Sequence, residues 1–220
     1  MTIRNERTAA IAGILAGRVG VASPRVLVVG CGSGQEAAVL AQALNAKVIG
    51  IDIVENFHRE ASEICRLQYG DATNLDFDDA SFDVVFSYHA LEHIPNYSRA
   101  LSEMHRALKP NGIYCIGTPN RSRLVGYVGG DSTLAQKIFW NYLDLIARLT
   151  GRFRNECGAH AGYTASELRT ILLEHFSTTE DVSTEYYRRL YVNHLGAINA
   201  VVGAGLGRFI FPSVYFAGTR

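Results

Sequence analysis

Short apolar segments alternate with segments of helical periodicity along the first half of the chain. Residues 34–44 are rich in helix-forming side chains, and residues 97–108 repeat apolar side chains every three or four positions. This alternation predicts an α/β fold, in which helices cover both faces of a parallel sheet. The apolar segments, expected as strands, are residues 25–30, 47–52, 66–72, 82–88 and 112–120.

A long insertion is expected after the fifth strand, at residues 119–157. Its apolar side chains recur at helical spacing over residues 134–149, and its six basic residues oppose three acidic ones. We interpret the insertion as a lid or substrate-pocket wall within a single domain of residues 1–220. The pattern favours a helix packed on the domain with solvated arginines. The alternative is that the apolar face and the arginines bind a lipid-like or aromatic acid substrate, or rest on a membrane surface.

Composition places the chain among ordinary globular proteins. Hydrophobic residues make up 48% of the 220 residues, and 21 basic residues balance 21 acidic ones, so no nucleic-acid partner is expected. Four widely spaced cysteines without a CxxC pair are expected to be reduced, buried thiols, and no metal site is predicted. The N-terminus lacks the apolar core of a signal peptide, so a cytoplasmic protein is expected.

Three glycines at alternate positions, Gly30, Gly32 and Gly34, follow the first strand. A glycine-rich turn at this place lets a ligand lie against bare backbone near a helix N-terminus. The next strand ends in Asp52, whose carboxylate can accept both hydroxyl groups of a ribose, and the third ends in Asp71, which can accept an adenine amine. We therefore expect a cofactor that contains a nucleoside. The GxGxG spacing and Asp71 disfavour a nicotinamide-dependent dehydrogenase.

The order of these motifs resembles the class I S-adenosylmethionine-dependent methyltransferases. The matching segments are "VLVVGCGSG", "GIDI", "YGDATNLDFDDASFDVVFSYHALEHIPN" and "LSEMHRALKPNGIYCIGTPN", all between residues 25 and 120. The resemblance implies a three-layer Rossmann-like sandwich around a mostly parallel, seven-stranded sheet. An antiparallel C-terminal hairpin would come from residues 176–187 and 208–219. The apolar residues 195–207 between them are expected to form a second pocket wall, a dimer contact or a membrane-touching loop.

The resemblance also implies a cofactor, S-adenosylmethionine, and a reaction that moves its methyl group to a small, apolar or aromatic acceptor and leaves S-adenosylhomocysteine. The glycines would pass under the methionine part of the cofactor. Asp52 would bind the ribose, Asp71 with Ala72 the adenine, and Ser87 with Tyr88 would line the methionine side. The full set of cofactor-binding residues predicted in this way is Gly30, Cys31, Gly32, Gly34, Asp52, Ile53, Asp71, Ala72, Ser87 and Tyr88.

One position departs from the family pattern, because Val28 stands where many relatives carry an acid that orients the methionine amino group. The alternative interpretation is therefore a protein that binds S-adenosylmethionine or S-adenosylhomocysteine but acts as a catalytically impaired regulatory or scaffolding module. A homodimer and a peripheral membrane contact are both left open.

Histidines are the candidate catalytic bases, because an imidazole titrates near neutral pH. His89 and His93 follow the fourth strand, where the reactive end of the cofactor is expected, and His160 precedes a helix whose capping box is formed by Thr164 and Glu167. Each of the three has a structural interpretation as well: His89 as a strand cap, His93 as a loop-fixing residue, and His160 as a helix-entry hydrogen bond.

Overall fold

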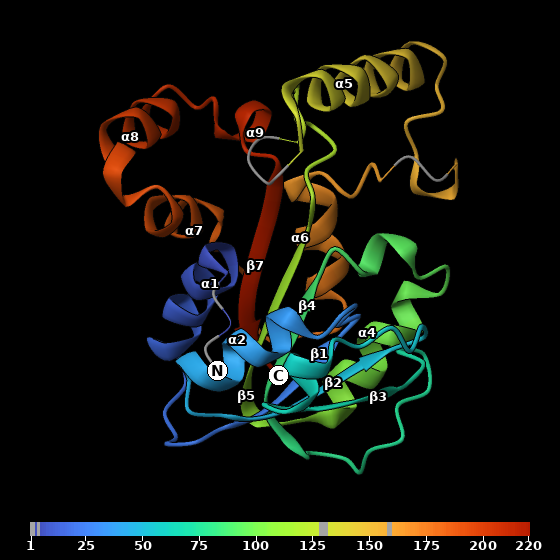
Figure 1. Ribbon diagram of the computed structural model, residues 1–220, viewed down its shortest axis with the longest axis vertical. Coiled ribbons are helices and arrows are strands. Elements are labelled where there is room, and N and C mark those ends of the chain that lie inside the picture. The colour runs from blue at the N-terminus through green and yellow to red at the C-terminus, as the bar shows by residue number, and fades with distance from the viewer. Residues whose placement is uncertain (1–2, 4, 128–131, 158–159) are drawn as a thin grey trace.

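The fold is built on one seven-stranded sheet within the residues that the computed structural model describes, 3, 5–127, 132–157 and 160–220. The strand order is β3-β2-β1-β4-β5-β7-β6, and strands β1 to β5 are parallel (Figure 1). Strand β7 runs antiparallel to both β5 and β6. The strands are β1 Arg25–Val29, β2 Lys47–Asp52, β3 Arg66–Tyr69, β4 Phe82–Tyr88, β5 Leu108–Pro119, β6 Glu180–Asp181 and β7 Ser213–Thr219.

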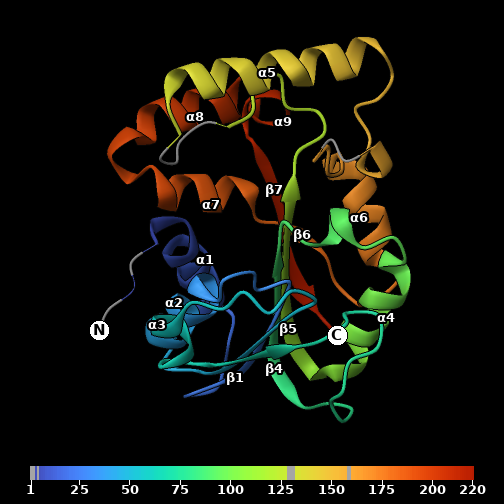
Figure 2. The same ribbon diagram turned by 45° about the vertical axis from the view of Figure 1, so that its right-hand side comes forward.

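Helices cover both faces of this sheet, which confirms the predicted three-layer α/β architecture (Figure 2). Helices α1, α2 and α7 pack on one face, and α4 and α6 pack on the other. The helices are α1 Glu6–Ala16, α2 Gln35–Ala43, α3 Arg59–Ser62, α4 Tyr97–Ala107, α5 Leu134–Leu149, α6 Ala165–Leu173, α7 Ser183–Leu190, α8 Leu195–Gly203 and α9 Gly207–Ile210. Three short 3₁₀ turns are η1 Leu91–His93, η2 Asn155–Cys157 and η3 Val192–His194.

The apolar run of β1 is continuous because both of its faces are buried. Val26 and Val28 join the core under α1 and α2, whereas Leu27 and Val29 join the core under α4 and α6. Alternate side chains of a strand point to opposite faces, so a central parallel strand needs apolar residues at every position. Val28, at the position where the resemblance implies an acid, is thus a core residue.

The helix starts follow the capping signals of the sequence. Thr164 and Glu167 form the predicted capping box of α6, and Thr133 with Gln136 forms another at the start of α5. Helix α5 spans the predicted residues 134–149. Cys31, Cys65 and Cys115 are free and buried, as expected, while the side chain of Cys157 lies outside the described residues.

The C-terminal hairpin differs from the expectation. Strand β6 is only two residues long, and residues 183–190, expected in part as a strand, form α7. The chain passes through α7, α8 and α9 before it returns as β7, so β6 and β7 pair without a short connection. Asp181 explains the early end of β6, because its carboxylate accepts a hydrogen bond from the Ser183 amide and starts the helix (2.8 Å).

Helices α5, α8 and α9 all lie beyond the same end of the sheet, and we call them the cap (Figures 1 and 2). The Leu124 amide donates to the Phe209 carbonyl (2.8 Å), which joins the segment before α5 to α9. The expected packing of α5 is wrong: no residue of the helix is buried, and Arg148 bonds inward instead of being solvated. Among the described residues, no helix combines the length and the hydropathy that a membrane crossing needs.

Candidate functional site

The glycine turn after β1 leaves bare backbone facing open space. Gly30, Gly32 and Gly34 have φ angles of 73°, 51° and 84°, in the left-handed region that favours glycine. A Cβ atom at Gly30 would lie 2.2 Å from the Cβ of Ala90, so this glycine lets the turn pack against the segment after β4. A Cβ atom at Gly32 would meet nothing within 4 Å. The turn therefore offers a free backbone surface at Gly32.

Asp52 at the end of β2 is tied to this turn. Its Oδ2 accepts a hydrogen bond from the Gly32 amide (2.8 Å), and its Oδ1 accepts one from the Val54 amide (3.0 Å). Each carboxylate oxygen has a further lone pair that remains for a ligand hydroxyl. Ile53, beside it, is 67% exposed and offers an apolar surface at the same edge.

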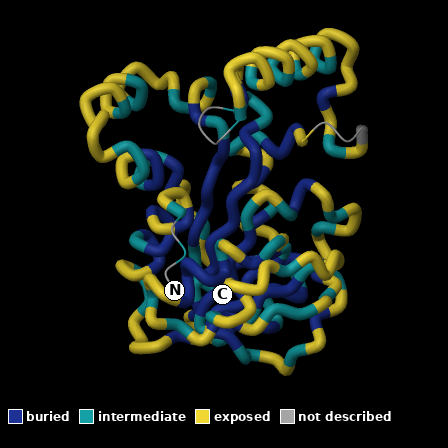
Figure 3. Tube along the Cα trace, in the orientation of Figure 1, coloured by how far each residue is buried: buried dark blue, intermediate teal, exposed yellow. Residues whose placement is uncertain are grey.

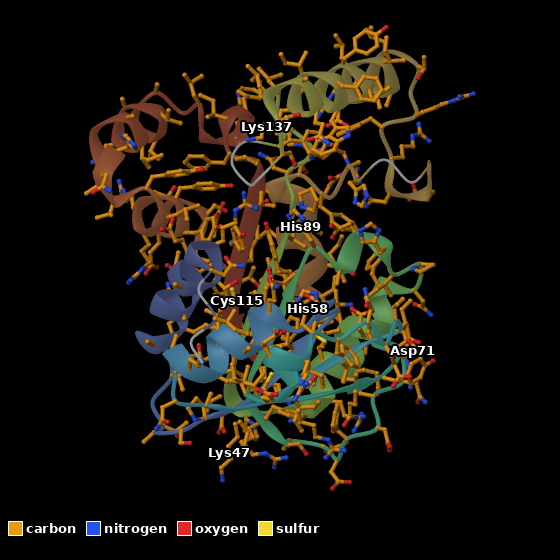
Figure 4. All side chains as sticks on the ribbon, viewed as in Figure 1. Lys47, His58, Asp71, His89, Cys115 and Lys137 are labelled. Atoms are coloured by element: carbon orange, nitrogen blue, oxygen red, sulfur yellow. The ribbon has the colours of Figure 1, made fainter. Side chains whose placement is uncertain are left out.

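Asp71, two residues after β3, is exposed and held in one orientation. The amide and the hydroxyl of Thr73 both donate to its Oδ1, each at 2.8 Å. These bonds lower the pKa of Asp71 below its ordinary value, so the carboxylate is charged at neutral pH. Ala72 is buried beneath it, and Figure 4 shows Asp71 at the outer edge of the sheet, well away from His89.

The remaining predicted cofactor residues divide into core and surface positions. Ser87 is buried, and its hydroxyl donates to the Val29 carbonyl (3.0 Å), so it joins β4 to β1. Cys31 is buried as well, and burial raises the pKa of its thiol to about 12, which leaves it without nucleophilic character at neutral pH. Tyr88 is half-buried, and its ring stacks on that of Tyr215 with 5.5 Å between ring centroids.

A cavity of about 350 Å³ lies between the sheet and the cap, and we call it the central cavity. Tyr88 and His89 at the end of β4 line it together with Pro212 and Ser213. Figure 4 shows His89 at this position, between the sheet below and the cap above. Its other lining residues are mostly aromatic or basic and include Arg7, Arg123, Tyr127, Trp140, Tyr186, Tyr187 and Tyr191.

Two of the three predicted histidines line this cavity. His89 has a φ angle of 51°, and its Nε2 lies 3.0 Å from the Ser213 hydroxyl oxygen. Although the imidazole is reachable from the cavity, the surrounding protein and the charge of Arg123 lower its pKa, so it is neutral at neutral pH. His160 lines the cavity from the cap side.

The third histidine, His93, contacts His160 edge to face, with 4.8 Å between ring centroids. It lines a second, larger cavity of about 860 Å³, which we call the side cavity, bordered by η1, η2 and α6. None of the side-cavity lining residues belongs to the glycine turn. The structure thus places His89 and His160 in the central cavity and His93 in the side cavity, with His93 and His160 in contact between them.

Glu92 is a site residue that sequence reasoning treated only as a loop contact. Its side chain is fully buried, and neither carboxyl oxygen has a hydrogen-bond partner among the described residues. Burial raises the pKa of this carboxyl to about 7. The Nε2 of His93 lies 3.9 Å from Oε1, but burial lowers the pKa of this imidazole, so it carries no charge to pair with the carboxylate at neutral pH. The only sequence signal was the adjacent pair Glu92 and His93 in the segment after β4.

Comparison with known proteins agrees with this geometry. Residues 27–116 match the family model described as "Methyltransferase domain". The demethylmenaquinone methyltransferase of Staphylococcus epidermidis is 42% identical over 103 residues, which cover 43% of this chain and 43% of that protein. The 27-O-demethylrifamycin SV methyltransferase of Amycolatopsis mediterranei is 33% identical over 116 residues, which cover 49% and 42% of the two chains.

The domain matched in this way spans residues 27–116, about two fifths of the chain. The domain holds the glycine turn, Asp52, Asp71 and the segment after β4, whereas the cap and the C-terminal helices lie outside the matched residues. The chain spans less than half of the length of the curated methyltransferases that it matches.

Solved structures share the fold of this chain over nearly its whole length. The YcgJ protein of Bacillus subtilis superposes with a TM-score of 0.59 at 17% identity and covers 95% of this chain and 97% of its own. Phosphoethanolamine N-methyltransferase 2 of Haemonchus contortus, solved with S-adenosyl-L-methionine, has a TM-score of 0.58 at 19% identity and covers 96% and 52%.

Proposed function

We propose that the chain is an enzyme that transfers a methyl group from S-adenosylmethionine to a small, apolar or aromatic acceptor. The observation that carries this proposal is the position of the aromatic central cavity. Tyr88 and His89 line it, and the next residue, Ala90, packs against Gly30 of the glycine turn. The relatives are named for small-molecule acceptors, demethylmenaquinone and a demethylrifamycin, which supports the same class.

The residues around the glycine turn fit the proposed cofactor. The open backbone at Gly32, the Asp52 carboxylate and the exposed Ile53 follow one another along the edge where β1 and β2 end. Asp52 would accept the ribose hydroxyls, and the charged, oriented Asp71 would accept the adenine amine. When bound, S-adenosylmethionine supplies an activated sulfonium methyl group and leaves S-adenosylhomocysteine.

The protein's part in the reaction is alignment, exclusion of water and removal of a proton. His89 is the first candidate base because Ser213 holds it at the cavity surface. Its lowered pKa keeps the imidazole neutral but also makes it a weak base, so a bound acceptor would have to raise this pKa for His89 to remove a proton. His160 is the second candidate base, because it lines the same cavity. We assign His93 to positioning, since it contacts His160 and lines the side cavity.

Residues 119–157 would act as the lid of this cavity within one domain. Trp140 of α5 and Tyr127 lie with ring centroids 5.1 Å apart, and both line the cavity. The cavity of about 350 Å³ is at the lower end of the range that small-molecule sites occupy. We place the acceptor in this cavity rather than in the larger side cavity, because only the central one includes Tyr88 and His89.

The cofactor proposal is tested by titration calorimetry with S-adenosylmethionine, S-adenosylhomocysteine and NAD. We expect both adenosyl compounds to bind and NAD not to bind. Asp52→Asn is expected to weaken adenosyl binding about tenfold or more, because a carboxylate that accepts ligand hydroxyls contributes about 1.5 to 3 kcal/mol. Glu55→Gln, an exposed acid three residues away, is the matched control. Absence of adenosyl binding to the wild type would refute the cofactor.

Transfer itself is tested with methyl-labelled S-adenosylmethionine and a panel of phenols, quinols and aliphatic amines. Label incorporated into an aromatic acceptor, and lost in His89→Ala while adenosyl binding is retained, is the expected result. Tight adenosyl binding without transfer to any acceptor class would favour the regulatory or scaffolding alternative.

A further inference from the structure

Helix α5 exposes its apolar face to solvent, whereas an ordinary surface helix exposes its polar face. Eight of its apolar side chains are 40% to 75% exposed, and none of its residues is buried. Figure 3 shows the outer side of the helix as an exposed band at the top of the molecule, and no described element covers it in Figures 1 and 2. The outward apolar residues are Leu134, Ile138, Phe139, Tyr142, Leu143, Leu145, Ile146 and Leu149.

The polar side chains of α5 face the protein instead. Asn141 forms two hydrogen bonds with the backbone of Gly126, one to its amide (2.7 Å) and one to its carbonyl (3.1 Å). Asp144 pairs with the buried guanidinium of Arg123 (3.0 Å) and accepts from the Tyr127 hydroxyl (3.3 Å). These contacts fix the rotation of the helix about its axis.

Arg148 completes this inward polar row. Its two terminal nitrogens donate to the carbonyls of Arg121 and Arg123 (3.0 and 2.8 Å), and its guanidinium lies 3.8 Å from the ring centroid of Phe153. Asn141, Asp144 and Arg148 follow one another at helical spacing, so they form a single face. Rotating the helix to bury its apolar face would break all of these bonds. The inward hydrogen bonds therefore keep the apolar face of α5 exposed. An exposed apolar patch of this kind marks an interaction surface.

The charges around the patch indicate what covers it. Asp144 is the only acidic residue of α5, and it points inward. The helix is followed by Arg152 and Arg154, which are exposed and make no ion pair with a described residue. Glu156, the next acid along the chain, lines the side cavity. An apolar helix face with aromatic residues, flanked by arginines and free of carboxylates, is complementary to an anionic lipid surface.

We propose that the outward face of α5 docks on the surface of a membrane that contains anionic lipids. The helix would lie in the plane of the interface, with Ile138 and Leu145 among the acyl chains and Arg152 and Arg154 at the headgroups. Trp140, on the inward side of the same helix, lines the central cavity, so docking brings this cavity next to the lipid. The proposal concerns binding alone and does not depend on the reaction that the domain catalyses.

The test is co-sedimentation of the full chain with vesicles of phosphatidylcholine, with and without phosphatidylglycerol. We expect the wild type to sediment with the anionic vesicles. Ile138→Glu combined with Leu145→Glu is expected to lower this partitioning about tenfold or more, because two carboxylates would enter the interface. Leu173→Glu on α6, a similarly exposed leucine outside the cap, is the matched control and should bind as the wild type does.

Two further outcomes decide the lipid assignment. Arg152→Gln combined with Arg154→Gln should weaken binding to the anionic vesicles about tenfold and leave the weaker binding to neutral vesicles unchanged. Binding that the Ile138→Glu, Leu145→Glu variant retains would refute docking through α5. If the wild type sediments with neither vesicle, and ultracentrifugation shows a dimer that this variant dissociates, a second copy covers the patch and the lipid proposal is wrong.

Discussion

Helices α4 and α5 are both amphipathic, yet they present opposite faces to the protein. Helix α4 buries Ala100, Leu101, Met104 and Ala107 against the sheet and turns most of its polar side chains outward. Helix α5 turns its leucines and isoleucines outward and bonds inward through the polar row that ends in Arg148. Helical periodicity identifies the two faces of a helix, but the surface beneath the helix decides which of them is buried.

The surface beneath α4 is apolar, whereas the surface beneath α5 is made of polar backbone groups. Under α4 lie the apolar side chains of the parallel strands, which only an apolar face can cover without loss. Under α5 lies an irregular segment of residues 120–127, which belongs to none of the seven strands and makes only single backbone contacts such as the bridge between Asn120 and Tyr163. Buried backbone groups of this kind need hydrogen bonds, and Asn141 and Arg148 supply them.

The largest expected difference between the two helices comes from truncating an apolar side chain. Leu101→Ala in α4 removes a fully buried side chain and should lower the free energy of unfolding by about 3 kcal/mol. Ile138→Ala in α5 removes an exposed one and should change it by less than about 0.5 kcal/mol. Urea unfolding of the two variants checks this. A loss at Ile138 as large as at Leu101 would mean that the outward face is covered within the chain itself.

A smaller effect is expected from the inward polar row of α5. Asp144→Asn removes the charge that pairs with Arg123, a guanidinium with only 5% of its side chain exposed. Breaking a buried pair in this way should cost about 2 kcal/mol of stability, because the arginine stays buried among carbonyl groups. Leu145→Asn, at the next position and facing outward, is the control and should cost less than about 0.5 kcal/mol. Equal stability of the two variants would contradict the inverted orientation of α5.

The same difference explains which parts of the fold the sequence could predict. Strands β1, β2 and β4 and helix α5 lie close to their predicted bounds, because a continuous apolar run or a clear helical period is a local signal. Strand β3 ends three residues before its predicted end, and β5 begins four residues before its predicted start. Helix α7 was missed although Val182, Tyr186 and Leu190 recur at helical spacing, since the family pattern suggested a strand there. The packing direction of α5 could not be read, because it depends on the backbone of residues 120–127.

In the candidate site, too, residues with a local sequence signal were predictable and residues from distant parts of the chain were not. Gly32, Asp52 and Asp71 were predictable because each follows a strand of a parallel sheet, and such strand ends share one edge. The aromatic wall of the central cavity was not, because Tyr186 and Tyr187 are nearly one hundred residues from Tyr88 along the chain. Glu92 was overlooked for another reason, since nothing in its neighbours reveals that both carboxyl oxygens are buried without a partner.

Two buried carboxyls near α4 are expected to differ in their pH dependence. Glu103 on the inward side of α4 pairs with Arg106 (2.8 Å) and accepts from the Leu75 amide (3.0 Å), and these bonds lower its pKa. Glu92, just before the helix, has its pKa raised from 4.5 to about 7 by burial. A lowered pKa adds stability that is lost as the pH falls through it. A raised pKa removes stability as the pH rises from 4.5 to about 7.

The two glutamine variants should therefore respond to pH in opposite directions. Glu92→Gln is expected to match the wild type near pH 4.5 and to exceed it by up to about 3 kcal/mol above pH 7, since the neutral amide never carries the buried charge. Glu103→Gln should be less stable than the wild type at neutral pH and should approach it as the medium becomes acidic. Urea unfolding at about pH 5 and about pH 8 measures both differences. If Glu92→Gln gains no stability at the higher pH, the carboxyl of Glu92 is solvated or paired when charged. The description of Glu92 as a buried acid without a partner would then be wrong.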